Sequence, residues 1–468
     1  MSIDLKKERE KIVSGSANVF YDEEVKITGE RYTSHSFMEK EMDKVWAKVW
    51  NIGGWSNEIP ESGDYITHEI GRESILMVRQ EDHSIKAFHN VCPHRGNRLV
   101  HDDNGSSPSF TCTYHGWKFN NEGILVYAQD EDDFPQGNPC GKINLTEIPC
   151  EIYGGFIWYN MDENCSSLFD FLGEVKKYFD MHDLNGMKRV YYKVSEVPFN
   201  WKALRDNFNE SYHLPMTHPQ IIDYFDDDYK NTDFELFETG HNLMKMKGCL
   251  PSLRDKGTFE MNEKLEGDLL NWNLNPKDFD GKAHLVREAL QKQKRKLGSK
   301  RGFDHFERMP DAWLTDAFHF NIFPGTSITF TAEVCTLQRT EPHPTDPNKS
   351  IYDHWQMALR ATDSENPETN PTMLVASPED MVEWKEVDKH VVIFGEETLS
   401  DVADQDLDRS SAQQLGFHSR GFKGAYLSGQ ENRVQQFHNF IDRYLSLIHI
   451  SEPTRRRGIS YAVVCLKK

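Results

Sequence analysis

The chain lacks the features that mark secreted and membrane proteins. Its eight cysteines are spread over 468 residues without the paired spacing of a disulfide framework. No apolar run approaches the roughly 20 residues that a membrane-spanning helix needs. The charged residues 4–10 do not resemble the start of a signal peptide. We therefore expect a reduced, cytoplasmic protein without a membrane partner.

Positive charge is also scarce. The chain has 54 Lys plus Arg against 75 Asp plus Glu, which gives a formal net charge of −21. A chain this acidic repels nucleic acids and anionic lipid surfaces, so we expect no nucleic-acid partner. The sequence also has no Gly-rich dinucleotide fingerprint after a predicted strand. NADH or NADPH could therefore act on this chain only through another protein.

The end of the chain differs in character from the rest. Residues 445–468 resemble translated sequencing-library adapter and contain the run Arg455-Arg456-Arg457 and Cys465. We set this segment aside as a non-native tail. The native sequence is expected to end close to Tyr444.

Chain length and the spacing of apolar and turn residues predict an α+β protein with several domains. The chain is longer than the roughly 250–300 residues at which single hydrophobic cores stop growing. Residues 1–45 form a predicted N-terminal arm with a helix around Phe37 to Trp46. Residues 46–165 hold short β-rich runs between turn residues, which predict a small antiparallel β domain. Residues 166–444 mix helices and strands in a larger domain.

Several elements of the larger domain can be predicted individually. Residues 206–212 are predicted helical, and residues 318–337 are predicted as strands with a break at Pro324-Gly325. Two late helices are predicted, one opened by Ser377 and one over residues 430–444. The polar, charged region 225–308 has no clear pattern.

Four residues of the predicted β domain form two short pairs, each with one cysteine thiolate and one histidine imidazole. The sequence reads Cys92-Pro-His94 and, further on, Cys112-Thr-Tyr-His115. Two cysteines on one iron and two histidines on the other make a Rieske [2Fe-2S] centre, with a potential of about −150 to +300 mV. A structural Cys2His2 zinc site is the alternative, but it usually groups its two cysteines together and its two histidines together. The mixed halves favour the cluster.

A second set of metal-binding residues lies in residues 200–219. Glu210 and His213 are three residues apart and would share one helix face. His213 and His218 would diverge by about 140° on an ideal helix. Because a helix normally ends before the residue preceding a proline, Pro215 would let His218 return to the same metal. Two histidines with one carboxylate form the usual non-haem Fe(II) oxygenase site, and either Glu210 or a distant acid would complete it.

A second Glu-x-x-His motif leaves a different iron chemistry open. Glu238 and His241 could pair with Glu210 and His213 in a carboxylate di-iron site on a helix bundle. Gly240 and the apolar residues around it, however, indicate a strand.

From about residue 35 to Tyr444 the chain resembles the large (alpha) subunit of Rieske non-haem iron aromatic-ring-hydroxylating oxygenases. The resemblance rests on the Cys-x-His and Cys-x2-His pair and on the acid-x2-His-x4-His segment. It implies a Rieske domain over residues 46–165. It also implies a helix-grip (START-like) catalytic domain over residues 166–444, with an antiparallel sheet and helices around a mononuclear Fe(II).

The resemblance also implies roles for single residues. The cluster ligands would be Cys92, His94, Cys112 and His115, and the iron histidines would be His213 and His218. Glu210 would bridge His213 to His115 or His94 of the neighbouring subunit, because a carboxylate can accept hydrogen bonds from both imidazoles.

The third iron ligand and one asparagine are harder to place. In the family the ligand is an Asp shortly before a Gln-x-Gly stretch, and here Asp404, Asp406 and Asp408 compete. We choose Asp406, eight residues before Gln414. Asn207 lies one position closer to the first iron histidine than the family's asparagine, so the family role of that asparagine does not carry over directly.

The resemblance implies a terminal oxygenase that hydroxylates an organic substrate with O2. A separate reductase, with or without a ferredoxin, would supply the electrons, and NADH or NADPH would act only through it. The assembly would be a homotrimer, with or without a small beta subunit. Segments around Phe208, Leu214, 225–308 and 318–330 are apolar enough to predict an aromatic or alicyclic substrate.

Three other functions are retained. Tyr212-His213 with Pro215 and His218-Pro219 is similar to members that oxidise quaternary amines, which would make the chain a monooxygenase or demethylase. A non-catalytic Rieske electron carrier would leave residues 166–444 without a role. A zinc-stabilised binding protein would lack the visible absorption of a Rieske cluster.

Overall fold

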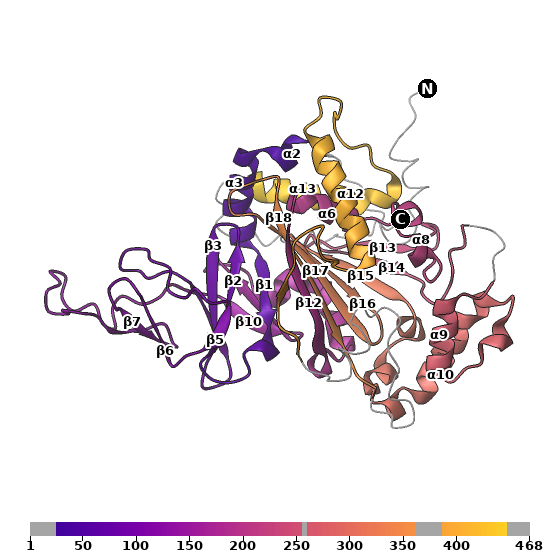
Figure 1. The fold of residues 1–468 in the computed structure, drawn as a ribbon, viewed down its shortest axis with the longest axis horizontal. Helices are drawn as coiled ribbons and strands as arrows, with labels where there is room; N and C mark the ends of the chain where they lie inside the picture. Colours follow the sequence, from indigo (N-terminus) through magenta and orange to yellow (C-terminus); the bar gives the residue numbers. More distant parts are fainter. Residues whose placement is uncertain (1–24, 255–259, 362–385, 447–468) are drawn as a thin grey trace, which may run out of the picture.

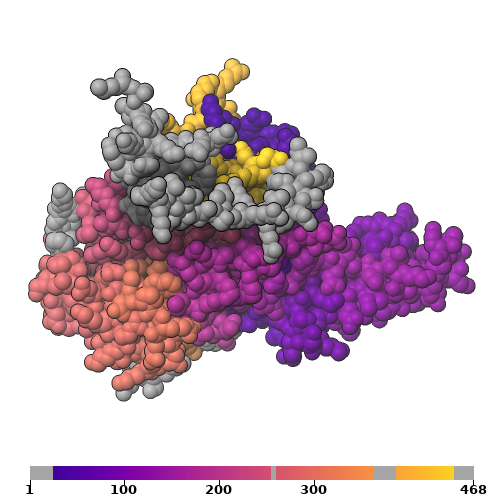
Figure 2. Space-filling view, turned by 180° about the vertical axis from the view of Figure 1, so that it is seen from behind, coloured from indigo at the N-terminus to yellow at the C-terminus, as the bar shows by residue number. Residues whose placement is uncertain are grey.

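The computed structural model describes residues 25–254, 260–361 and 386–446. The helix predicted to begin at Ser377 and all but the first two residues of the predicted tail 445–468 lie outside these ranges. The molecule is elongated, with a narrow β-rich lobe at one end and a large sheet with helices at the other (Figure 1). The same lobe projects from the body in the view from behind (Figure 2). No helix of the described ranges combines the length and the apolar character that crossing a bilayer requires.

The N-terminal arm forms the helix that its apolar spacing predicts. It contains α2 (Glu30–Thr33), α3 (His35–Lys44) and the 3-10 turn η1 (Trp46–Lys48). The Ser34 side chain accepts a hydrogen bond from the backbone of Phe37 and so caps α3. Met38 and Met42 on its inner face are buried.

The β-rich lobe is built from three antiparallel sheets. The order in the largest is β5 (Asn104–Ser106), β2 (Asp64–Ile70), β3 (Glu73–Arg79), β4 (Ile85–His89) and β9 (Glu147–Ile148). The second is β1 (Trp50–Trp55), β11 (Phe156–Asn160) and β10 (Cys150–Tyr153). The third, β6 (Ser109–Thr111), β7 (Lys118–Asn120) and β8 (Leu125–Tyr127), lies toward the tip of the lobe (Figure 1).

One eight-stranded sheet forms the centre of the larger part. Its order is β13 (Asp233–Leu236), β14 (Asn242–Met246), β15 (Ala317–Ile322), β16 (Thr326–Phe330), β17 (Val334–Pro342), β18 (Ser350–Ala358), β12 (Lys188–Val197) and β19 (His390–Val391). Neighbouring strands are antiparallel except β12 and β19, which makes the sheet mixed. The strands predicted over residues 318–337 are confirmed, with Pro324-Gly325 between β15 and β16.

Helices cover this sheet and its edges. They are α4 (Leu168–Leu172), α5 (Lys176–Met181), α6 (Trp201–Phe208), α7 (Leu214–Thr217), α8 (Pro219–Ile222), α9 (Glu263–Asn271), α10 (Val286–Leu297), α12 (Asp401–Phe417) and α13 (Asn432–Ser446). The remaining 3-10 turns are η2 (Ser56–Glu58), η3 (Gly173–Val175), η4 (Leu184–Gly186), η5 (Pro276–Phe279), η6 (Ala283–Leu285), η7 (Ser299–Arg301), η8 (Asp304–Arg308), η9 (Asp311–Leu314) and η10 (Gly429–Glu431). The α+β expectation is confirmed, and the unplaced region 225–308 supplies β13, β14, α9 and α10.

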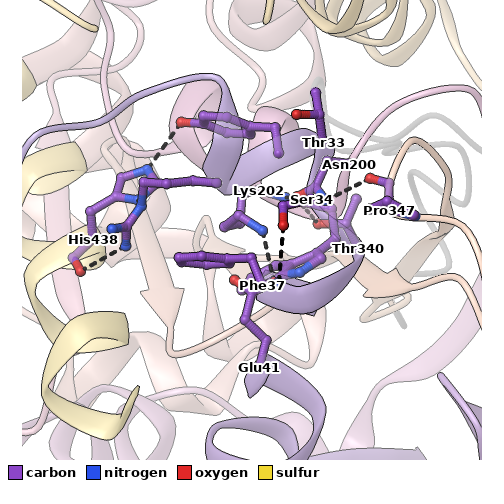
Figure 3. Close-up of polar contacts among 12 residues, drawn as sticks. Thr33, Ser34, Phe37, Glu41, Asn200, Lys202, Thr340, Pro347 and His438 are labelled. Carbon is purple, nitrogen blue, oxygen red and sulfur yellow. Dashed lines mark hydrogen bonds and ion pairs between the residues drawn. The ribbon is translucent and has the colours of Figure 1, made fainter. Parts of the chain in front are cut away.

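A buried ion pair joins the N-terminal arm to α6. Lys202 Nζ lies 2.9 Å from Glu41 Oε2, and the two side chains are 0% and 1% exposed. In Figure 3 they meet beside Phe37 and Ser34. Because a buried charge without a partner is strongly unfavourable, this pair fixes how the arm sits on α6.

Candidate functional site

The two predicted cluster loops have the same backbone conformation. The carbonyls of Cys92 and Cys112 each accept a hydrogen bond, at 3.0 Å, from the amide of the glycine four residues later. These glycines, Gly96 and Gly116, have φ of +76° and +71°. An added Cβ would meet nothing within 4 Å at either position, so the backbone conformation is what favours glycine there.

The two loops bring their predicted ligands together in like pairs: the Cys92 and Cys112 side chains lie within hydrogen-bonding reach of each other, and the two histidine rings are in contact. Cys92 and Cys112 are buried, and the His94 and His115 rings lie 4.7 Å apart between centroids. Trp117 stacks on His94 at 4.6 Å. Asn97 Nδ2 lies 3.7 Å from Cys112 Sγ. Two thiols and two imidazoles brought together from two matched loops fit the donor set of a Rieske cluster.

The second metal segment folds differently from the prediction. Helix α6 ends at Phe208, so the helix predicted over residues 206–212 is wrong beyond that point and Glu210 does not share a helix with His213. His213 is instead the N-cap of the short helix α7, whose first turn contains Pro215. Proline favours the first turn because its missing N–H would be unpaired there anyway. Pro215 therefore begins a helix rather than ending one, and His218 follows at its end.

Asp406 of α12 meets both histidines. His218 Nε2 lies 2.8 Å from Asp406 Oδ1, and His213 Nε2 lies 3.5 Å from the same oxygen. One ligand atom from each of the three residues lies within 4.8 Å of the others. Asp406 and His218 are buried, and His213 is half-buried. Two imidazoles and one carboxylate at these separations fit a single non-haem iron.

The outward ring nitrogens of both histidines are held by acceptors. Glu210 Oε1 lies 2.6 Å from His213 Nδ1, and Gln405 Oε1 lies 2.6 Å from His218 Nδ1. Such partners place the ring proton on Nδ1 and leave Nε2 able to bind a metal. Burial lowers the pKa of His213, but the carboxylates of Glu210 and Asp406 outweigh it, so the net pKa lies above the usual value.

The other two candidates for the third metal ligand, Asp404 and Asp408, lie elsewhere on α12. Asp404 accepts hydrogen bonds from Thr398 Oγ1 at 2.6 Å and from the Leu399 amide at 2.9 Å. Asp408 is exposed. Asn207 donates to Asp406 Oδ1 at 2.8 Å, so it holds the carboxylate. Of the three acids, only Asp406 lies beside the two histidines.

Gln405 is a site residue that the sequence analysis missed. It precedes Asp406 directly and belongs to no ligand motif, so its contact with His218 could be found only in three dimensions. Its Oε1 also accepts a hydrogen bond from Gln220 Nε2 at 2.8 Å.

Removing this acceptor is expected to weaken metal binding. Gln405→Leu should lower iron affinity by about 10- to 100-fold, the usual effect of losing a ligand's hydrogen-bond partner. Metal titration followed by elemental analysis measures this change. Gln413→Leu, an exposed glutamine on the same helix, is the control, and equal iron affinity in the two variants would remove Gln405 from the site.

One further histidine, His241, serves the fold. His241 Nε2 pairs with the Phe171 carbonyl at 2.8 Å, and its Nδ1 accepts from the Phe323 amide at 3.0 Å. Both ring nitrogens therefore have hydrogen-bond partners. His241 directly precedes strand β14 and does not lie on a helix. This geometry argues against the di-iron alternative.

Two cavities adjoin the Asp406 group. The first, of about 290 Å³, is lined by His213, His218 and Asp406 together with side chains of the central sheet. The second, of about 620 Å³, shares Asn207, Glu210 and His213 with the first and continues toward Asp206, Glu431 and Tyr426.

Comparison with known families identifies both parts of the chain. The family described as the ring hydroxylating alpha subunit (catalytic domain) matches residues 182–447, and the Rieske [2Fe-2S] domain matches residues 49–137. The chain belongs to the ring-hydroxylating alpha subunit family. Its cofactors are accordingly a Rieske [2Fe-2S] cluster and a mononuclear non-haem iron, for which His213, His218 and Asp406 are the candidate ligands.

Individual relatives within this family differ in their named substrates. The carnitine monooxygenase oxygenase subunit of Escherichia coli (strain K12) is 36% identical over 197 residues, which cover 41% of this chain and 52% of that relative. The chain thus spans about half the length of that relative. The methanesulfonate monooxygenase hydroxylase subunit alpha of Methylosulfonomonas methylovora is 28% identical over 73% of this chain and 74% of the relative.

Solved structures show the same fold. A quaternary ammonium Rieske monooxygenase matches with a TM-score of 0.62 and 22% identity, covering 90% of this chain and 95% of the other. Naphthalene 1,2-dioxygenase with bound indole matches with a TM-score of 0.63 and 19% identity, covering 93% and 94%. At these identities the likeness concerns the fold alone.

Proposed function

We propose that this chain is the terminal oxygenase component of a system that inserts oxygen from O2 into an organic substrate. The convergence of His213, His218 and Asp406 on the wall of the 290 Å³ cavity carries the proposal. Cys92, His94, Cys112 and His115 would hold the [2Fe-2S] cluster, as proposed from the sequence. When bound, the cluster supplies single electrons, and the iron offers open positions for O2.

The protein's own residues would keep this site ordered and selective. Glu210 and Gln405 hold the two histidine rings in one tautomer, and Asn207 holds the Asp406 carboxylate. The cavity wall then positions the substrate beside these ligands and excludes bulk water.

Electron delivery is proposed to occur between copies of the chain. In Figure 1 the strands β6 and β7, which flank the Cys112 loop, lie at the end of the molecule far from α8 and α12. Glu210 lines the second cavity, where it could accept a hydrogen bond from His115 or His94 of another copy. Such transfer needs more than one copy of the chain, and we propose the homotrimer that the family resemblance implies. A separate reductase would bring electrons from NADH or NADPH, and the acidic chain suits a basic docking surface on it.

The carbon skeleton of the substrate is proposed to be a ring or a short chain. A cavity of about 290 Å³ lies at the small end of the usual range for ligand pockets. Its apolar side chains include Phe208, Leu214, Ile221 and Phe225, which suit an aromatic or alicyclic molecule. The names of the carnitine and glycine betaine relatives favour a quaternary amine as the second candidate.

Purified protein tests the proposal directly. We expect the visible spectrum of a Rieske cluster, bound iron, and ¹⁸O from labelled O2 in the product when a surrogate reductase and a substrate panel are supplied. Zinc with a colourless protein would refute the cluster, and a cluster without any oxygenated product would favour a plain electron carrier.

Glu210→Gln tests the proposed bridge. The amide retains an acceptor oxygen for His213, so both metals should stay bound. Product formation in a single turnover should slow by about 10- to 100-fold, because the second hydrogen bond is lost. Glu238→Gln changes an exposed glutamate of the other Glu-x-x-His motif and serves as the control. Unchanged single-turnover kinetics in Glu210→Gln would rule out the bridge.

A further inference from the structure

One wall of the 290 Å³ cavity carries polar side chains, although the lining as a whole is mostly apolar, as the sequence predicted. Four adjacent strands contribute this wall, and cross-strand partners place its members in pairs. Their shared feature is a side chain that can hydrogen-bond: His319, Thr329, Thr336, Gln338, His354 and Gln356. Successive side chains of a strand point to opposite faces of the sheet, so each of these polar residues alternates with a buried apolar or charged residue on the other face. The polar residues of the wall are therefore not adjacent in the sequence, and the sequence analysis did not group them.

His354 differs from His319, the other histidine of this wall. It is 2% exposed, and neither ring nitrogen has a well-aligned hydrogen-bond partner among the described residues; the Leu399 carbonyl is the near acceptor, which leaves the other ring nitrogen for a ligand. His319, in contrast, uses both nitrogens, with Thr329 Oγ1 at 2.8 Å and the Phe208 carbonyl at 2.9 Å. A buried polar side chain without partners is unfavourable in a native protein, and one that lines a cavity is suited to a ligand.

His354 is an uncharged donor and acceptor. Burial lowers its pKa to about 4, and the nearby Leu399 carbonyl opposes this shift only in part. A neutral imidazole carries one N–H and one free lone pair. Directly across the strand pair, Gln338 Nε2 donates to Tyr352 Oη at 2.9 Å, and the side-chain carbonyl of Gln338 is a further acceptor on this wall.

The charged and aromatic side chains of the cavity do not suit a permanent cation. Its carboxylates, Glu210 and Asp406, already pair with the two iron histidines. Recognition of a quaternary ammonium group typically uses a cage of several aromatic rings. In the described lining, Phe208 and Phe225 are the phenyl rings and no Tyr or Trp is present.

We propose that His354, with Gln338 beside it, binds an oxygen group of the substrate, and that the substrate is a small organic acid or alcohol. The carbon skeleton would lie against the apolar side chains near His213. This inference rests on the proposed function, because it places the oxygen group in the cavity of the oxygenase site. It makes His354 a specificity-determining residue.

Four probes that share a benzyl group test the substrate class. Phenylacetate, benzyl alcohol, toluene and benzyltrimethylammonium would be titrated by calorimetry into the full-length protein loaded with cluster and iron. We expect the acid or the alcohol to bind at least about tenfold more tightly than toluene and the ammonium compound. Which of the two binds identifies carboxylate or hydroxyl recognition. Tighter binding of the ammonium compound, or no binding of either oxygen-bearing probe, would overturn the proposal.

Variants of His354 test whether this residue causes the preference for the oxygen-bearing probe. His354→Leu should raise the Kd of the preferred probe about tenfold and leave that of toluene within about twofold. His354→Gln keeps a donor and an acceptor and should restore most of the preference. Ile221→Val, an apolar change in the same lining, should alter all four Kd values alike. A retained preference in His354→Leu, or none in His354→Gln, would contradict the assignment.

Calorimetry separates this inference from the proposed function. Binding needs no turnover, so the preference can be present even if no oxygenated product forms. In that case the proposed function fails and the His354 site stands. If instead toluene is oxygenated with no preference for either oxygen-bearing probe, the proposed function stands and the His354 site fails.

Discussion

Replacing Asp406 with alanine is expected to abolish oxygenation while leaving the [2Fe-2S] spectrum unchanged. The residue lies on α12, away from the β-rich lobe that contains the proposed cluster ligands. Losing the hydrogen-bond partner of a ligand already lowers metal affinity or activity by about 10- to 100-fold, and removing the ligand itself should exceed the upper end of that range. Iron content, the visible spectrum and product formation together measure the outcome.

The neighbouring acids are matched controls for Asp406. Asp408→Ala changes an exposed residue and should leave iron content and activity close to those of the parent. Asp404→Ala removes the acceptor of the Leu399 amide at the start of α12 and should cost about 1 kcal/mol of stability without loss of iron. Iron loss in Asp408→Ala with retention in Asp406→Ala would reverse the ligand assignment.

Lys202→Met is expected to destabilise the fold strongly. The change leaves the Glu41 carboxylate buried at 1% exposure without its cation. Breaking one partner of a buried ion pair costs about 3–5 kcal/mol. Differential scanning calorimetry should show a lowered Tm, with the part of the molecule that contains the arm and α6 affected first.

A double variant shows whether the lowered Tm of Lys202→Met comes from the unpaired buried carboxylate of Glu41 or from lost packing. Lys202→Met combined with Glu41→Leu removes both charges and should recover much of the lost Tm, because well-packed apolar residues often replace a buried pair without penalty. The exposed pair Lys177–Glu174 provides the contrast, and Lys177→Met should change stability by at most about 1 kcal/mol. A double variant no more stable than Lys202→Met would mean that packing is responsible.

The polar wall bears on how substrates differ within this family. Named relatives include oxygenases of carnitine, glycine betaine, methanesulfonate and biphenyl. In this chain the sheet positions facing the cavity include His354 and Gln338, so we expect substrate choice to depend more on strands β17 and β18 than on the metal ligands.

The sequence by itself determined the features that depend on residues close together in the chain. Two mixed thiolate and imidazole pairs predicted the cluster, because a cysteine and a histidine two or three residues apart can reach the two irons of one cluster from a single tight loop. The two histidines of residues 213–218, with Pro215 between them and acids available as a third ligand, likewise predicted a mononuclear site. The strands over residues 318–337 followed from local composition and a Pro-Gly turn.

The tertiary structure decided what depends on residues far apart in the chain. Asp404, Asp406 and Asp408 are alike in sequence, and only the packing of α12 brings Asp406 to His218, 188 residues away. Gln405 has no motif at all, and its role comes from the same packing. Pro215 is compatible with ending one helix or beginning another, and the end of α6 at Phe208 settles it. The polar cavity wall exists only where four strands align, because pairing between strands, not order within them, places His354 beside Gln338.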